Sequence, residues 1–130
     1  MKTNSKFTTT NSIESVINSI HRILTSTLDE AYIAVKDRKM KGASCKGMIS
    51  VFRRSDLQEG DGKKATPIIK YAFYDSTYNP GCLGSIAIYG ENLASLCSMI
   101  KKSRSLFGHR VIEVSMEQGR RPFIDVKFAA

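Results

Sequence analysis

The first regular pattern along the chain is a stripe of apolar residues that predicts an amphipathic helix. From Ile13 to Leu28, apolar residues recur at steps of three and four, and polar residues fill the remaining positions. This spacing places the apolar side chains on one side of an α-helix. Asn11 and Glu14 have the spacing of a capping box, so we expect Asn11 to be the N-cap. The stripe would cover a sheet or pair with a second copy of itself.

The next apolar stretches alternate with polar residues and predict strands. Residues 46–54 and 66–75 are rich in β-forming side chains, and residues 82–89 follow the turn signal at 79–81. Residues 55–65 are polar and predict a loop. Residues 31–35 could extend the helix or form a short strand. In the stretch 66–75, alternation predicts two faces: Ile69, Tyr71 and Phe73 on one, and Ile68, Lys70, Ala72 and Tyr74 on the other.

A second helix and a hairpin complete the pattern. Asn92 is the expected N-cap of this helix, and Gly108 fits the position just after its end. In the hairpin of residues 111–117 and 123–128, we expect Ile112, Val114 and Met116 to share the apolar face.

The order of these elements predicts an α+β domain. We expect an antiparallel sheet of about five strands with two amphipathic helices packed on one face, in the order α-β-β-β-α-β-β. Residues 11–130 would form this single domain, and residues 1–10, which lack apolar periodicity, would form a flexible arm.

Composition excludes several classes of protein. Hydrophobic residues make up 42% and charged residues 25% of the 130 residues, unlike a collagen-like or disordered chain. No apolar run approaches the roughly 18 residues of a membrane span, and the polar N-terminus has no secretory signal. We therefore expect a cytoplasmic or otherwise intracellular location, with the nucleoplasm or an organelle included.

Residues that carry out catalysis or bind metals are few and scattered. His21 flanks the apolar stripe of the first helix, and His109 follows Gly108, where a helix cap is the simpler role. The thiols of Cys45, Cys82 and Cys97 have no metal-binding spacing. No hydrolase, zinc-protease or nucleotide-binding motif occurs. We expect no enzymatic activity, no metal and no cofactor.

Basic and aromatic residues provide the main functional signal. The chain has 20 Lys and Arg against 12 Asp and Glu, a net charge of +8 that favours polyanionic partners. Half of the basic residues fall within 36–70, with tyrosines among or just after them, and Lys70 and Tyr74 share a strand face, as do Phe52 and Arg54. Basic side chains beside aromatic rings are what single-stranded nucleic acid requires. The competing interpretation is a solvated basic surface with tyrosines in the core. The candidate nucleic-acid-binding residues are Lys36, Arg38, Lys39, Lys41, Lys46, Arg53, Arg54, Lys70, Tyr74, Tyr78, Tyr89, Arg120 and Arg121.

The strand-then-helix run of residues 85–96 resembles a corner of known single-stranded-DNA-binding domains. These domains are of the transcriptional-coactivator, Whirly and Pur-alpha type, and the resemblance covers roughly residues 45–107. It implies four strands followed by a helix, dimerisation, and binding of single strands on a curved sheet through basic and aromatic residues. This chain adds a helix before those strands and a hairpin after the second helix.

Two functions remain open at this stage. The first is a non-catalytic, weakly specific single-stranded DNA- or RNA-binding protein that forms a homodimer. The alternative is an adaptor or inhibitor that docks on an acidic protein partner through its helix stripe or an open sheet edge. Charge reversal of Arg53 and Arg54 would abolish nucleic-acid binding only in the first case.

Overall fold

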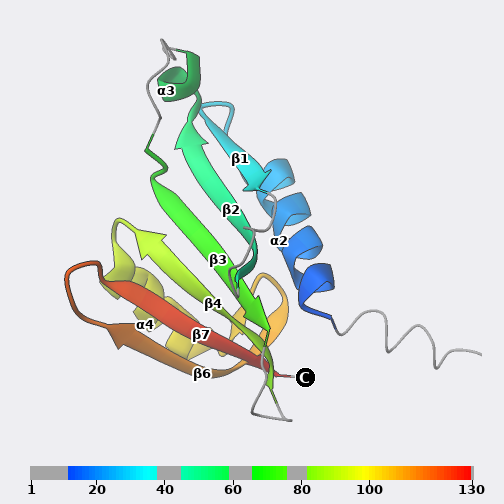
Figure 1. Ribbon diagram of the computed structural model, residues 1–130. Helices are drawn as coiled ribbons and strands as arrows, with labels where there is room; N and C mark the ends of the chain where they lie inside the picture. The colour runs from blue at the N-terminus through cyan, green and yellow to red at the C-terminus, as the bar shows by residue number, and fades with distance from the viewer. Residues whose placement is uncertain (1–11, 38–44, 59–65, 76–81, 130) are drawn as a thin grey trace, which may run out of the picture.

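The computed structural model describes residues 12–37, 45–58, 66–75 and 82–129 (Figure 1). Their order confirms the α+β class with an antiparallel sheet. The elements are α2 (Ile13–Thr27), β1 (Tyr32–Asp37), β2 (Cys45–Arg53), α3 (Arg54–Gln58), β3 (Ile69–Asp75), β4 (Cys82–Gly90), α4 (Leu93–Ser103), β5 (Ser105–Leu106), β6 (His109–Glu117) and β7 (Phe123–Ala129).

The sheet has seven strands in the order β1-β2-β3-β4-β7-β6-β5, so the expectation of about five is wrong. One added strand is β1, where the sequence left helix and strand open. Leu28 is extended and ends α2, and Ala34 then pairs with Val51 and packs against the core. The other is β5, whose two residues pair with the start of β6. A strand this short carries no alternation that a sequence could reveal.

The start of α2 and the end of α4 differ from the sequence prediction. The N-cap of α2 is Ser12, whose hydroxyl oxygen accepts the Ser15 N–H at 3.1 Å; Asn11 lies outside the described residues. Asn92 is the N-cap of α4, as expected, but its side chain makes no capping hydrogen bond. The helix ends at Arg104 in the left-handed conformation, and Gly108, at φ +82°, lies in the turn between β5 and β6.

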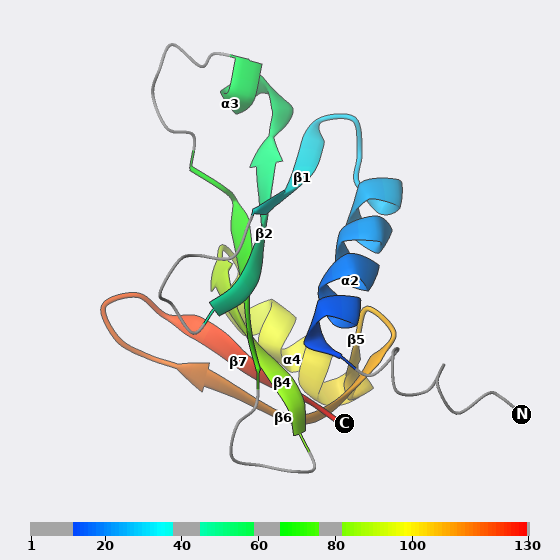
Figure 2. The ribbon, with the colours of Figure 1, turned by 45° about the vertical axis from the view of Figure 1, so that its right-hand side comes forward.

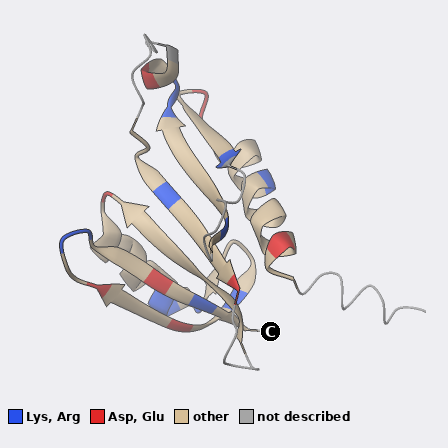
Figure 3. Cartoon of the chain, viewed as in Figure 1, with Lys and Arg blue, Asp and Glu red and all other residues tan. Residues whose placement is uncertain are grey.

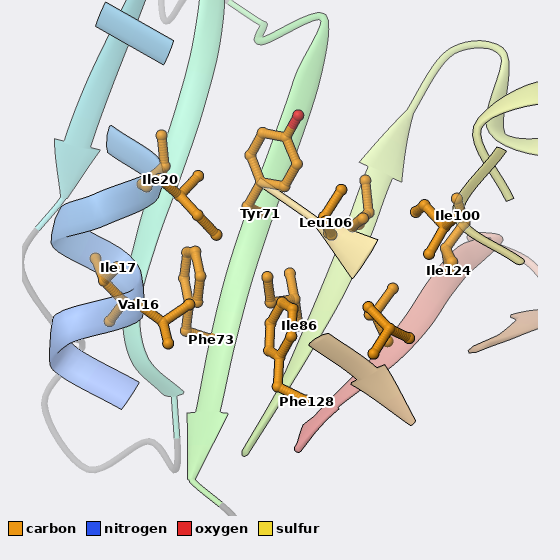
Figure 4. Packing of buried hydrophobic residues seen from close by; sticks show 14 of the residues in the cluster. Val16, Ile17, Ile20, Tyr71, Phe73, Ile86, Ile100, Leu106, Ile124 and Phe128 are labelled. Carbon is orange, nitrogen blue, oxygen red and sulfur yellow. The ribbon is translucent and has the colours of Figure 1, made fainter. Parts of the chain in front are cut away.

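Both long helices pack against the same face of the sheet (Figure 2). α2 covers β1, β2 and β3, whereas α4 covers β4, β7 and β6. Figure 4 shows Val16, Ile17 and Ile20 of α2 meeting Phe73. Farther along the sheet, Ile100 of α4 belongs to the same apolar cluster as the strand residues Ile86, Ile124 and Phe128. The opposite face is left without a helix among the described residues.

A bulge in β6 changes which of its side chains enter the core. The register with β7 shifts between Val111 and Glu113. Val111 is therefore buried, whereas Ile112, expected on the apolar face, is 40% exposed. Val114 and Met116 pack against the core as expected. The extra residue of a bulge breaks the alternation on which the sequence prediction depended.

Candidate nucleic-acid interface

The face of the sheet that lies opposite α2 and α4 carries the candidate interface, and we call it the open face. Strand alternation and the register assign its residues. Its middle consists of small buried residues, Ala72 and Ala87, against which Met48, Tyr74 and Tyr89 pack. The open face comprises Ile33, Val35, Met48, Ser50, Phe52, Lys70, Ala72, Tyr74, Ser85, Ala87, Tyr89, Glu113, Ser115, Glu117, Phe123, Asp125 and Lys127.

One end of the open face brings together basic and aromatic side chains from three segments. Lys70 of β3 is the register partner of Tyr89 of β4. The ring centroids of Tyr89 and Phe123 are 5.3 Å apart, with a tilt of 35°. Arg121, in the loop between β6 and β7, places its guanidinium carbon 5.8 Å from the centroid of the Tyr89 ring. This distance is within the range of a cation–π contact.

A groove of about 280 Å³ lies at this end, and we call it the rim groove. Its lining is Thr66, Pro67, Lys70, Tyr89, Gly90, Leu93, Arg121 and Pro122. Gly90 has φ +147°, and a Cβ there would lie 2.6 Å from the Ile68 carbonyl oxygen. Only glycine fits this close approach between the end of β4 and the start of β3.

The ion pairs of the open face lie at the end away from the rim groove. Among the described residues, neither Lys70 nor Arg121 has a carboxylate within 4.0 Å. At the other end, Lys127 contacts Asp125 at 3.0 Å and Glu113 at 4.0 Å. The hydrogen bond to Asp125 raises the pKa of Lys127. Figure 3 shows basic positions on β3 and at the β6–β7 loop, and acidic positions along β6 and β7. A polyanion would therefore favour the rim groove.

Tyr74 adds an uncharged ring to the open face. Burial raises the pKa of its phenol, and the neighbouring Cys45 and Tyr89 raise it further. The hydroxyl therefore stays protonated at neutral pH and does not repel phosphates. Tyr71, on the core face, is different: burial raises its pKa to about 12, and it is 5% exposed. This assigns Tyr74 and Tyr89, but not Tyr71, to the candidate interface.

Several predicted site residues lie away from the rim groove. Lys36 is on the core side of β1, where its Nζ donates to Asn18 Oδ1 of α2 at 2.8 Å. Lys46 is 3.4 Å from a carboxylate oxygen of Asp75. Arg53 lies two residues after Val51 in β2, so its side chain is on the same face of the sheet, the helix side. Arg120 is exposed in the β6–β7 loop but does not line the groove.

The prediction that Arg54 shares a strand face with Phe52 is wrong. β2 ends at Arg53, and Arg54 begins α3. The Arg54 Nε donates to the Glu30 carbonyl oxygen at 2.8 Å, which holds this side chain at the β1 end of the sheet. Four further candidates lie outside the described residues: Arg38, Lys39, Lys41 and Tyr78.

Sequence reasoning missed Phe123 and the proline walls of the groove. Phe123 has the parity of Asp125 and Lys127, so its place opposite the core face was readable from the hairpin pattern. Its contact with Tyr89 was not readable, because it requires β7 to pair with β4. Pro67, which the sequence predicts within the strand 66–75, precedes β3, and Pro122 lies in the β6–β7 loop.

The three cysteines are not part of a metal site among the described residues. Cys45, Cys82 and Cys97 are buried free thiols, and the first two donate to the carbonyls of Gly47 and Gly84. Across the described part of the chain, no three His, Cys, Asp or Glu side chains are grouped to hold a metal ion.

Comparisons with known proteins give no relative. No family model, no curated protein and no solved structure matches this chain. In the ranges that the structure describes, no helix is long and apolar enough to cross a membrane.

Proposed function

We propose that the protein binds single-stranded DNA or RNA on the open face, without catalysis, and that its rim groove is the centre of contact. The observation that carries this proposal is the convergence of Lys70, Tyr89 and Arg121, from three separate segments, around one groove. A basic surface without function would not require two cations to border an aromatic pair.

The chemistry follows from the nature of these side chains. Lys70 and Arg121 neutralise neighbouring phosphates and release their counterions. A base stacks against the tilted pair of Tyr89 and Phe123, either in place of the Arg121 guanidinium or beneath it. A duplex hides the faces of its bases, so the proposed site favours single strands.

The order of elements gives further support. β1, β2, β3 and β4 form an antiparallel meander that is followed by α4. Four strands and a helix is also the order of the single-stranded-DNA-binding domains that residues 45–107 resemble, although the first of the four strands here, β1, precedes that range. We include the homodimer of those domains in the proposal, since two open faces on one strand would strengthen binding by avidity.

The test is fluorescence anisotropy with a labelled single-stranded oligonucleotide and its duplex, at low and physiological salt. The Lys70→Glu/Arg121→Glu variant is expected to lose binding at least tenfold and to flatten the salt dependence. Lys102→Glu/Arg110→Glu is the matched control, because it makes the same charge change on exposed residues outside the groove. Equal losses of affinity in both variants would mean that the oligonucleotide is held by non-specific electrostatic attraction and not by the rim groove.

A second variant tests stacking apart from charge. Tyr89→Leu keeps an apolar side chain but removes the ring, and it should weaken single-strand binding by about five- to a hundredfold. Tyr32→Leu, on the helix side of β1, should leave binding unchanged. Unchanged binding in Tyr89→Leu would contradict the stacking role.

A further inference from the structure

The outer edge of β6 is open over most of its length. β5 pairs only with His109 and Arg110. The Val111 N–H donates to the Arg104 carbonyl at 2.9 Å. From Ile112 to Glu117, no described strand pairs with the outer side of β6. An open edge offers backbone N–H and C=O groups with which another extended chain can pair.

A groove of about 280 Å³ runs beside this edge, between β6 and α4, and we call it the edge groove. Ile100, Val111 and Val114 provide apolar lining, and the bulge leaves Ile112 40% exposed next to them. An added strand at the edge would direct every second side chain toward this apolar surface.

The α4 wall of the edge groove is basic. Lys101 and Arg104 line it, and both are exposed. No carboxylate in the described ranges lies within 4.0 Å of either side chain. Glu113, which also lines the groove, lies 4.0 Å from the Lys127 ammonium. The groove therefore combines an apolar surface with two cations that acidic side chains would complement.

One antiparallel register of a second copy of β6 is disfavoured at this edge. In an antiparallel pair centred on Ser115, Glu113 of one copy would face Glu117 of the other on the open face. Like charges directly opposite each other destabilise a strand pair. The occupant must instead carry neutral or basic residues on that side.

We propose that the edge of β6 binds an extended segment of another protein by strand addition. The segment presents apolar and acidic side chains in turn to the edge groove, and uncharged or basic side chains to the open-face side. Lys101 and Arg104 pair with its carboxylates, and Ile112 and Val114 contact its apolar side chains. The edge groove and the rim groove have no lining residue in common, so this interface does not depend on nucleic-acid binding.

The test uses the full chain and a labelled peptide of about nine residues, long enough to pair with the whole open edge. Threonine occupies every second position, and valine and aspartate alternate at the others. The wild type should bind it in an anisotropy titration, and amide exchange should slow in residues 112–117. Lys101→Glu/Arg104→Glu should weaken binding at least tenfold and should instead bind a peptide with lysine in place of aspartate. Lys102→Glu/Arg110→Glu should bind as the wild type does.

Three outcomes would overturn the proposal. One is that the aspartate peptide fails to bind the wild type. Another is that both double variants, once shown to be folded by circular dichroism, lose affinity equally. The third is that a single-stranded oligonucleotide displaces the peptide from wild type and from Lys70→Glu/Arg121→Glu alike, which would make Lys101 and Arg104 part of a nucleic-acid surface.

Discussion

At the scale of single residues, Gly84 marks the closest approach between β4 and its neighbours. A Cβ at this position would lie 2.5 Å from the Tyr74 carbonyl oxygen and 2.8 Å from Ile13 Cδ1. Gly84→Ala must therefore shift backbone, and we expect it to lower the free energy of unfolding by about 2 kcal/mol. Urea denaturation measures this change.

Gly108→Ala is the control for this substitution. Gly108 has φ +82° but no atom within 4 Å of an added Cβ. Its alanine variant should cost about 1 kcal/mol from backbone strain alone. If Gly108→Ala lowered the free energy of unfolding more than Gly84→Ala does, the close contacts at Gly84 would not be destabilising as proposed.

His109 should make stability depend on pH. Its Nε2 is buried without a hydrogen-bond partner in the described structure, and its ring packs edge-on against Phe128. Burial lowers its pKa below 6.5, so the unfolded chain takes up the proton first. The stability contributed by neutral His109 is complete above about pH 6.5 and is lost as the pH falls toward the folded-state pKa.

The measurement is the urea midpoint between about pH 7.5 and about pH 5.5. His109→Phe keeps the aromatic contact and removes the titration, so its midpoint should fall less than that of the wild type over this range. Parallel pH profiles of the two proteins would exclude His109 as the cause.

Residue parity explains which parts of the candidate site could be predicted. Lys70 and Tyr74 were correctly assigned to one face because β3 alternates without a bulge. Lys36 was included for its charge alone. Its position beside Asn18 depends on the pairing of β1 with β2, which no local pattern specifies. Phe123 was missed for the same reason, since its partner Tyr89 is far away in sequence.

At the scale of elements, the stability of α2 depends on its first turn as well as on its apolar stripe. The Ser12 hydroxyl accepts the Ser15 N–H at 3.1 Å. Ser12→Ala should therefore lower the free energy of unfolding by about 1 kcal/mol. In Ser26→Ala, an exposed hydroxyl is removed from the last turn, and stability should stay within about 0.5 kcal/mol of wild type. Thermal and urea unfolding of both variants check the difference.

Elements with a long, regular pattern were predictable, and irregular ones were not. The stripe of α2 and the alternation of β3 and β7 each extend over several repeats. β1 follows α2 closely, and its apolar residues fit either a helix or a strand until Val51 is known to lie opposite Ala34. The bulge of β6 accompanies its long-range pairing with β7, so local periodicity predicted Ile112 as a core residue although it is exposed.

At the scale of the whole molecule, the net charge of +8 is less informative than where the charges lie. Lys70 and Arg121 border one end of the open face, whereas Glu113 and Asp125 lie toward the other. Glu117, the register partner of Phe123, stands on the β6 border of the same end as Arg121. A bound strand would therefore cross β3 and β4 near the rim groove and avoid the border of β6. Net charge alone would predict no such path.

This path can be tested by removing the acidic border. Glu117 is the last residue of β6, exposed on the open face beside the β6–β7 loop, and accepts a hydrogen bond from the Ser115 hydroxyl at 2.9 Å. Glu117→Lys should strengthen single-strand binding several-fold, because a repulsive charge beside the phosphates becomes attractive.

Glu14→Lys is the control, because it makes the same charge change on exposed α2, on the far side of the sheet. At low salt both variants should gain affinity through net charge. At physiological salt, where the Debye length is about 8 Å, only Glu117→Lys should keep its gain, since only that residue lies near the proposed path. Equal gains at both salt concentrations would mean that the strand is held by the overall field and not by the open face.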